Sequence, residues 1–159
     1  MKGPDQIRFV VDRMLGRLAR MLRLLGYDTR YDRTATPADL GFLAQQEGRV
    51  LLTRGAAEKR FTAPSMPFVV PSDSPPVQLR EVVRHFALDT QTGLWTRCTL
   101  CNGALRSVEK AAVATEVPPR AFEAYQDFFR CSGCGKIYWR GSHVERTNQN
   151  LQRILLGQD

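Results

Sequence analysis

The chain has 159 residues, 43% of them hydrophobic, which suits one domain with a real core and room for a small insert. It contains no apolar run near the roughly 18 residues of a membrane span. Its N-terminus also lacks a signal-peptide pattern, so we expect a soluble, cytoplasmic protein without a membrane partner. The net charge of +7 and the excess of arginine over lysine indicate a polyanionic partner, nucleic acid first, although a merely soluble basic surface would carry the same charge.

Short apolar runs alternate with helical patterns through the first 90 residues. Strands are expected at 7–11, 27–31, 49–53 and 67–71. Helices are expected from Met14 to the stop at Gly26, from the Thr36-Pro37 start to Gly48, and from Val77 onward after the turn at 72–76. This order predicts an α/β fold in which helices flank a parallel sheet on both faces.

The first of these helices has two faces of opposite character. Its apolar face carries Met14, Leu15, Leu18, Leu22 and Leu25, and the opposite face carries Arg13, Arg17, Arg20 and Arg23. The arginines form either a solvated face or a surface that binds phosphate. Phosphate binding is of interest because Arg13 directly follows Asp12.

Four cysteines, and no others, stand in two Cys-x-x-Cys pairs. They are Cys98, Cys101, Cys131 and Cys134. Two such pairs supply the four soft ligands of a tetrahedral Zn²⁺. Gly103 and Gly135 follow them closely, where a chain that turns around a metal benefits from free φ. Disulfides fit poorly without a sign of secretion, and a redox motif would not explain two copies, so we expect a structural zinc ribbon.

Two further helical patterns complete the chain. One is expected at 120–129, between the cysteine pairs, and an amphipathic one runs from Glu145 to Leu156. We therefore divide the chain into an α/β domain at 6–90, a zinc ribbon at 91–143, and a C-terminal helix at 144–159 that docks on the main body.

Acidic residues follow several expected strands. In open α/β sheets, ligands bind beyond the carboxyl ends of the strands, where this chain has Asp12, Asp32, Thr53-Arg54-Gly55 and Ser72-Asp73. Such acids could hold Mg²⁺ or Mn²⁺ against a phosphodiester. Each acid also has a local explanation: Asp12 as a helix N-cap, Asp39 in the first turn of a Thr-capped helix, and Asp73 as a turn residue.

Several segments in order resemble the PIN-like ribonuclease domains with a C-terminal zinc ribbon, a family first described at the end of a mutator exonuclease. The resemblance spans roughly residues 8–146. The matching segments are Phe9-Val-Val-Asp12-Arg-Met-Leu-Gly-Arg-Leu-Ala-Arg20, Leu24-Leu-Gly-Tyr-Asp28, Gly48-Arg-Val-Leu-Leu-Thr-Arg54, Gln78-Leu-Arg-Glu81, Arg97-Cys98 through Asn102-Gly103, and Tyr138-Trp-Arg-Gly-Ser-His143.

The resemblance implies a PIN-like fold and Mg²⁺- or Mn²⁺-dependent cleavage of RNA by an activated water. Asp12 would then be the first metal ligand, Asp39 the next, and Asp73 a further catalytic candidate. Candidate RNA contacts are Arg13, Arg17, Arg54, Arg140 and His143. Tyr138 and Trp139 could form a stacking platform for single strands, or simply pack the ribbon onto the body. His143 could equally be a structural histidine.

The chain departs from the family at one position. The family typically has an aspartate after Leu-Thr-Arg, and this chain has Gly55, so one carboxylate of the expected cluster is missing. Glu58 would replace it only if this stretch is helical. The alternative function is therefore an inactive or weakly active RNA-binding module, and a protein-interaction role for the ribbon is a third possibility.

Overall fold

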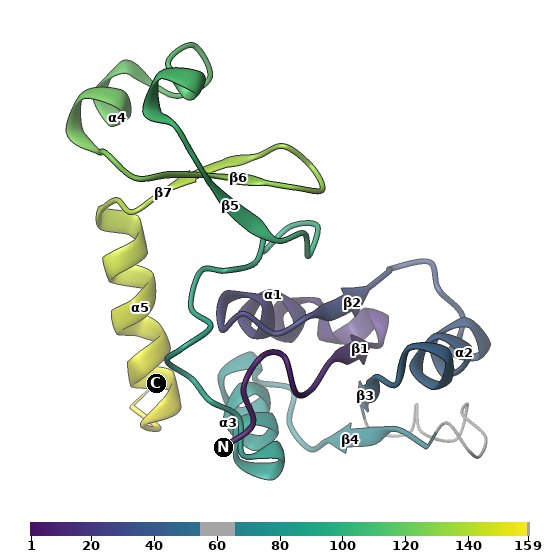
Figure 1. The fold of residues 1–159 in the computed structure, drawn as a ribbon. Coiled ribbons are helices and arrows are strands. Elements are labelled where there is room, and N and C mark those ends of the chain that lie inside the picture. Colours follow the sequence, from purple (N-terminus) through teal and green to yellow (C-terminus); the bar gives the residue numbers. More distant parts are fainter. Residues whose placement is uncertain (55–65, 159) are drawn as a thin grey trace.

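The main body is built on a parallel four-stranded sheet. The computed structural model describes residues 1–54 and 66–158. In spatial order the strands are β2 (Thr29–Tyr31), β1 (Phe9–Val11), β3 (Val50–Arg54) and β4 (Phe68–Val70), all parallel (Figure 1). The predicted α/β class is confirmed. Each strand begins and ends within two residues of its predicted range, because the β-branched runs that mark the strands are local.

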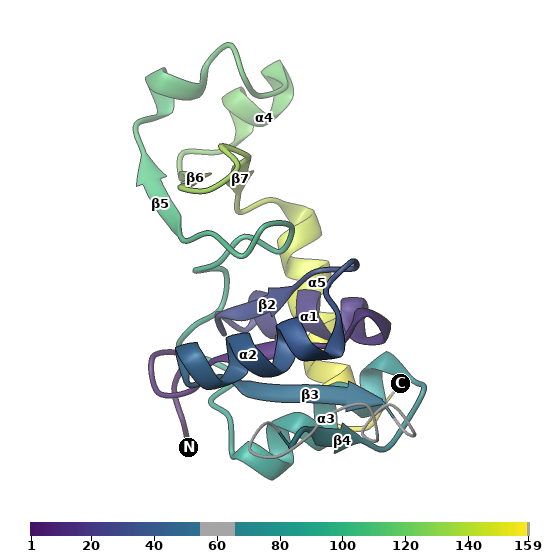
Figure 2. The same cartoon turned by 90° about the vertical axis from the view of Figure 1, so that its right-hand side faces the viewer.

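Alternating side chains of the central strands bury two separate cores. Phe9, Val11 and Leu52 belong to the large core, and Val10 and Leu51 belong to a small one on the opposite face. The large core is covered by α1 (Gly16–Leu24), which follows the short helix η1 (Arg13–Leu15), and by α3 (Pro75–Phe86). The small core is covered by α2 (Pro37–Glu47) (Figure 2). Helices therefore flank both faces of the sheet, as predicted.

The ribbon is an antiparallel sheet that stands apart from the body (Figure 1). Its order is β5 (Leu105–Val108), β6 (Phe128–Cys131) and β7 (Ile137–Trp139). The helix predicted at 120–129 is wrong for its second half, since α4 covers only Pro119–Ala124, after the short helix η3 (Lys110–Val113), and β6 begins at Phe128. Phe128 is fully buried in the ribbon core, so pairing with β5 and β7 overrides the local helical pattern.

The last helix, α5 (Ser142–Leu155), leads from the ribbon back to the body. Its Leu151 and Ile154 are buried in the large core, and Arg80 of α3 donates a hydrogen bond of 3.0 Å to the carbonyl oxygen of Ile154. The ribbon is thus connected to the body at both of its chain ends (Figure 1). Within the described ranges, no helix has both the length and the apolar character needed to cross a membrane.

Candidate functional site

The four cysteines converge at the base of the ribbon. All four Sγ atoms lie within 4.8 Å of one another, although Cys98 and Cys101 precede β5 while Cys131 ends β6. The Sγ atoms of Cys101 and Cys131 are 3.3 Å apart and those of Cys98 and Cys134 are 3.8 Å apart, so no disulfide joins them. Four sulfurs gathered around one point fit a tetrahedral zinc ion.

The backbone around the sulfurs is shaped for this cluster. Gly135 has a φ of +76°, as expected for a turn that favours glycine, but Gly103 is needed for another reason. A Cβ atom on Gly103 would lie 2.7 Å from the Sγ of Cys131, which leaves no space for a side chain. The sequence correctly predicted that glycine is needed at position 103. The reason is the lack of space for a Cβ atom and not the free φ that was expected.

Without a cation, ionisation of Cys98 is favoured at the expense of Cys101. Burial disfavours the thiolate of Cys98, yet hydrogen bonds from the backbone N–H of Cys101 and from the hydroxyl of Tyr138 outweigh it and lower the pKa of Cys98. Burial raises the pKa of Cys101, and its hydrogen bonds with neighbouring cysteines raise it further. A divalent cation would remove this conflict by stabilising all the thiolates together.

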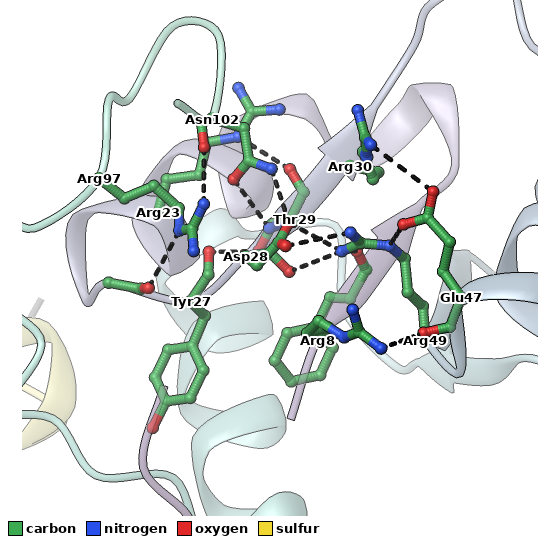
Figure 3. A network of polar contacts seen from close by, with 12 residues as sticks. Arg8, Arg23, Tyr27, Asp28, Thr29, Arg30, Glu47, Arg49, Arg97 and Asn102 are labelled. Atoms are coloured by element: carbon green, nitrogen blue, oxygen red, sulfur yellow. Dashed lines mark hydrogen bonds and ion pairs between the residues drawn. The ribbon is translucent and has the colours of Figure 1, made fainter. Parts of the chain in front are cut away.

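A buried polar network joins the first cysteine pair to the body (Figure 3). Arg23 of α1 donates through Nη1 to the carbonyl oxygens of Leu100, at 2.8 Å, and Thr99, at 3.2 Å, and through Nε to that of Thr29. Asn102, directly after Cys101, accepts from the backbone N–H of Thr29 at 2.9 Å. Arg23 therefore binds two backbone carbonyl oxygens within the first cysteine pair and one at the start of β2, which links the ribbon to the body.

Asp28 is the centre of the second half of this network (Figure 3). Arg49 donates to both of its carboxylate oxygens, at 2.8 and 3.0 Å, and the amide of Asn102 donates to it at 2.7 Å. Partial burial alone would raise the pKa of Asp28, but the hydrogen bonds from Arg49 and Asn102 lower it below its usual value. The ribbon is therefore anchored through a charged pair.

Arg23 is a correction to the expected basic outer face of the first helix. Only 4% of Arg23 is exposed, whereas Arg13, Arg17 and Arg20 are exposed as predicted. Helical spacing places the four arginines near one another on the helix surface. The ribbon covers the last turn of α1, however, and buries Arg23 where the ribbon meets the body.

Asp12 lies at the carboxyl end of the central strand β1. It is 4% exposed, and its Oδ2 accepts a hydrogen bond of 2.8 Å from the hydroxyl of Thr53 at the end of β3. Asp12 occupies the N-cap position of η1 but makes no side-chain capping bond there. The capping explanation for Asp12 is thus wrong, and its carboxylate is oriented by a neighbouring strand.

Asp73 follows β4 and is engaged by the residue next to Thr53. The guanidinium of Arg54 forms an ion pair with Oδ1 of Asp73 and donates to the carbonyl oxygen of Val70 at 2.8 Å. Thr53 and Arg54 therefore orient the acids of two different strands. Sequence reasoning missed Thr53 as a site residue, although a threonine at the end of an apolar strand was the available signal.

Asp39 is placed by its own helix. The hydroxyl of Thr36 accepts from the backbone N–H of Asp39, and Oδ2 of Asp39 accepts from the backbone N–H and hydroxyl of Thr36 at 2.8 and 2.7 Å. These hydrogen bonds from Thr36 lower the pKa of Asp39. The local explanation for Asp39 is therefore present as a capping box. Its side chain lines a hollow of about 740 Å³ beside α2, together with Asp32 and Arg33.

The described acids do not form a preassembled cation site. Within residues 1–54 and 66–158, the four cysteines are the only group of three or more His, Cys, Asp or Glu ligands brought this close together. Mg²⁺ can nevertheless be held by one or two carboxylates when water and substrate phosphate supply its other oxygens. Gly55 and Glu58 lie outside the described residues.

An arginine-lined groove of about 780 Å³ lies at the carboxyl edge of the sheet. It is bordered by Arg13, Arg17 and Arg20, by Tyr31 and Arg33 at the end of β2, and by Asp73 after β4. The groove thus runs past the residues that follow three of the strands, where ligands bind in open α/β sheets. Arg33 and Arg20 were not among the predicted contacts.

The remaining predicted contacts lie elsewhere. Arg54 is occupied by Asp73, and the guanidinium of Arg140 lies 5.7 Å from the ring centroid of Phe129 on the ribbon. His143 lies in the first turn of α5 and packs edge-on against Trp139, with ring centroids 6.0 Å apart. The structure therefore places Arg13 and Arg17 in one groove, whose lining does not include Arg140 or His143.

Fold and site together define an α/β domain with carboxylates and a basic groove at one edge of its sheet, and an attached four-cysteine ribbon. The model of the Mut7-C RNAse domain family matches residues 7–151, and the chain belongs to this family. The comparisons with curated proteins and with solved structures found no match. Family membership confirms the resemblance seen in the sequence, indicates ribonuclease activity and implies an RNA substrate.

Proposed function

We propose that the chain is a metal-dependent ribonuclease that hydrolyses RNA phosphodiester bonds beside Asp12. The observation that carries this proposal is the setting of Asp12: a buried carboxylate at the end of the central strand, held by Thr53. Arg13, the next residue, lines the basic groove. A carboxylate next in sequence to a residue of an arginine-lined groove could hold a metal ion close to a phosphate bound there, which supports metal-assisted phosphodiester hydrolysis.

Each group has a role in this proposal. Bound Mg²⁺ or Mn²⁺, held by Asp12 with Asp39 as the second candidate, would supply an activated water and neutralise charge on the phosphate. Thr53 orients Asp12 through its 2.8 Å hydrogen bond. Arg13 and Arg17 attract the RNA backbone into the groove and fix its position there.

Asp12→Asn should abolish cleavage and leave RNA binding intact. Loss of a residue that only orients a metal ligand costs 10–100-fold, so loss of the ligand itself should lower the cleavage rate by more than about 100-fold. The measurement is the initial rate on single-stranded RNA with Mn²⁺, beside the binding affinity of the same variant. Asp5→Asn, an exposed acid at the N-terminus, is the control. Full activity in Asp12→Asn would remove Asp12 from the mechanism.

A non-cleaving RNA-binding module is the second candidate. It is favoured by the engagement of Asp39 with Thr36 and of Asp73 with Arg54, together with glycine at position 55. In this function the groove binds RNA with a strong dependence on salt concentration and releases no product.

Gly55→Asp should separate the two functions. If the chain is an impaired nuclease, as we propose, the added carboxylate should raise the Mn²⁺-dependent rate at least about tenfold, because a second carboxylate strengthens the ion's attachment. Gly55→Asn, which has the same shape without the charge, should not. Unchanged RNA binding with no gain in cleavage would favour the module.

A further inference from the structure

A second hollow, of about 460 Å³, lies where the ribbon meets the body. Its walls come from α1, from the segment before the first cysteine pair, from β7 and from the start of α5. The residues that give it its chemistry are Arg20, Trp95, Lys136, Tyr138, Trp139 and His143. The chain has two tryptophans, and both line this hollow. Its volume is within the range of small-molecule sites.

The aromatic walls are held in place by contacts with neighbouring side chains. The indole N–H of Trp95 donates to Oδ1 of Asn148 at 2.8 Å, and the hydroxyl of Tyr138 lies 3.0 Å from Sγ of Cys98. His143 meets Trp139 edge-on. All three of Trp95, Tyr138 and Trp139 are only partly buried, so parts of their rings remain open to a ligand.

The charges at the hollow suit a ligand with phosphates. Lys136 is exposed, with Nζ 5.4 Å from the ring centroid of Tyr138, and Arg20 is exposed on α1. No aspartate or glutamate is among the described residues that line it. An acidic peptide would satisfy the two cations, but it would leave the aromatic walls without a partner.

The hollow and the basic groove share one lining residue. Arg20 borders both, and Arg13, Arg17 and Arg20 follow one another at about one helical turn. Arg13 lies on η1, and Arg17 and Arg20 lie on α1, which follows it directly. A strand whose phosphates lie along these arginines would therefore carry its next bases to the aromatic walls.

We propose that this hollow binds an unpaired nucleobase of the RNA strand whose backbone occupies the groove. The inference rests on the proposed RNA-directed function and names its substrate class, which is single-stranded RNA. Aromatic rings stack on any exposed base face, and flanking cations neutralise the adjacent phosphates. Bases inside a duplex are stacked on their neighbours and would not reach the hollow.

The test is tryptophan fluorescence of the zinc-loaded full chain without added Mg²⁺ or Mn²⁺. The two probes are a short unstructured RNA and an abasic strand of the same length and charge. The RNA should quench the fluorescence and bind about tenfold more tightly than the abasic strand, because one stacked base supplies that difference. Trp95→Phe and Trp139→Phe identify the quenched ring.

The variant that tests the site is Lys136→Ala with His143→Ala, since both side chains are exposed. It should reduce quenching and weaken the binding of both strands, because both carry the phosphates that the flanking cations neutralise. The matched control is Lys110→Ala, a partly buried ribbon lysine 4.8 Å from the ring centroid of Phe122 and outside the hollow.

Three results would overturn the inference. Equal affinity for the two strands would do so, as would RNA affinity and quenching that are unchanged in the double variant. If either occurs while Asp12-dependent cleavage persists, the nucleobase site fails and the ribonuclease stands. Absence of both RNA binding and cleavage would overturn the two proposals together. Quenching by RNA without cleavage would support the site and favour the binding module.

Discussion

Cys98→Ser is expected to unfold the ribbon and leave the parallel-sheet body folded. The ribbon has only three buried residues in its own core, Val113, Val117 and Phe128, which is too few to order about 50 residues. Structural zinc contributes on the order of 10–16 kcal/mol in small zinc domains, so its loss should exceed the ribbon's own stability. The body retains a separate core formed by α1, α3 and the sheet.

Zinc content and hydrogen exchange measure this outcome. The wild-type chain should carry stoichiometric zinc and protect the amides of β5, β6 and β7, and Cys98→Ser or chelated protein should lose both. Ser107→Ala, at an exposed position of β5, is the control and should keep them. A protected ribbon in zinc-free protein would contradict the structural role of the metal.

Asp28→Asn is expected to destabilise the folded chain by about 3 kcal/mol. The side chain of Arg49 is 3% exposed and would lose its bidentate partner, keeping only Glu47 and backbone carbonyls. Removing one partner of such a buried pair typically costs 3–5 kcal/mol, and the 20% exposure of Asp28 places this pair at the lower end. Thermal unfolding should therefore shift down by roughly 6–12 °C.

The same variant has a defined pH dependence. Because the pKa of Asp28 is lowered on folding, its stabilisation is complete above the unfolded-state pKa of about 3.9 and is lost as the pH falls through the folded-state value. The difference between wild type and Asp28→Asn should be constant near neutral pH and shrink below about pH 4. Asp127→Asn, an exposed acid, is the control and should show neither effect.

Local signals predicted most of the secondary structure because they act within a few residues. Thr36-Pro37 and Gly48 mark both ends of α2, where the capping box and a φ of +60° at Gly48 are observed. The failure at 120–129 has the opposite cause: Phe128 and Phe129 continue a helical pattern, yet they pair with strands that lie elsewhere in the sequence. A local pattern carries no information about such partners.

The sequence indicated where an acid of the candidate site lies, but not which side chains bind the acids. Strand ends and family motifs pointed to Asp12, and the structure shows a buried carboxylate there. They did not indicate that Thr53 would orient it or that Arg54 would bind Asp73, since both contacts cross between strands. The involvement of Asp12, Asp39 and Asp73 in catalysis stays a prediction.

The sequence by itself determined the family, the parallel α/β class and the four cysteines that could hold a metal ion, because these depend on residue types and short motifs. Only the tertiary structure decided that Arg23 is buried where the ribbon meets the body, while Arg20 borders both the basic groove and the hollow beside the ribbon. These arginines occupy neighbouring turns of one exposed-looking face. Arg23 and Arg20 differ in burial because the ribbon lies against the last turn of α1, where Asn102, Arg23 and Asp28 hold it. Contacts between segments about 75 residues apart leave no periodic signal in the sequence.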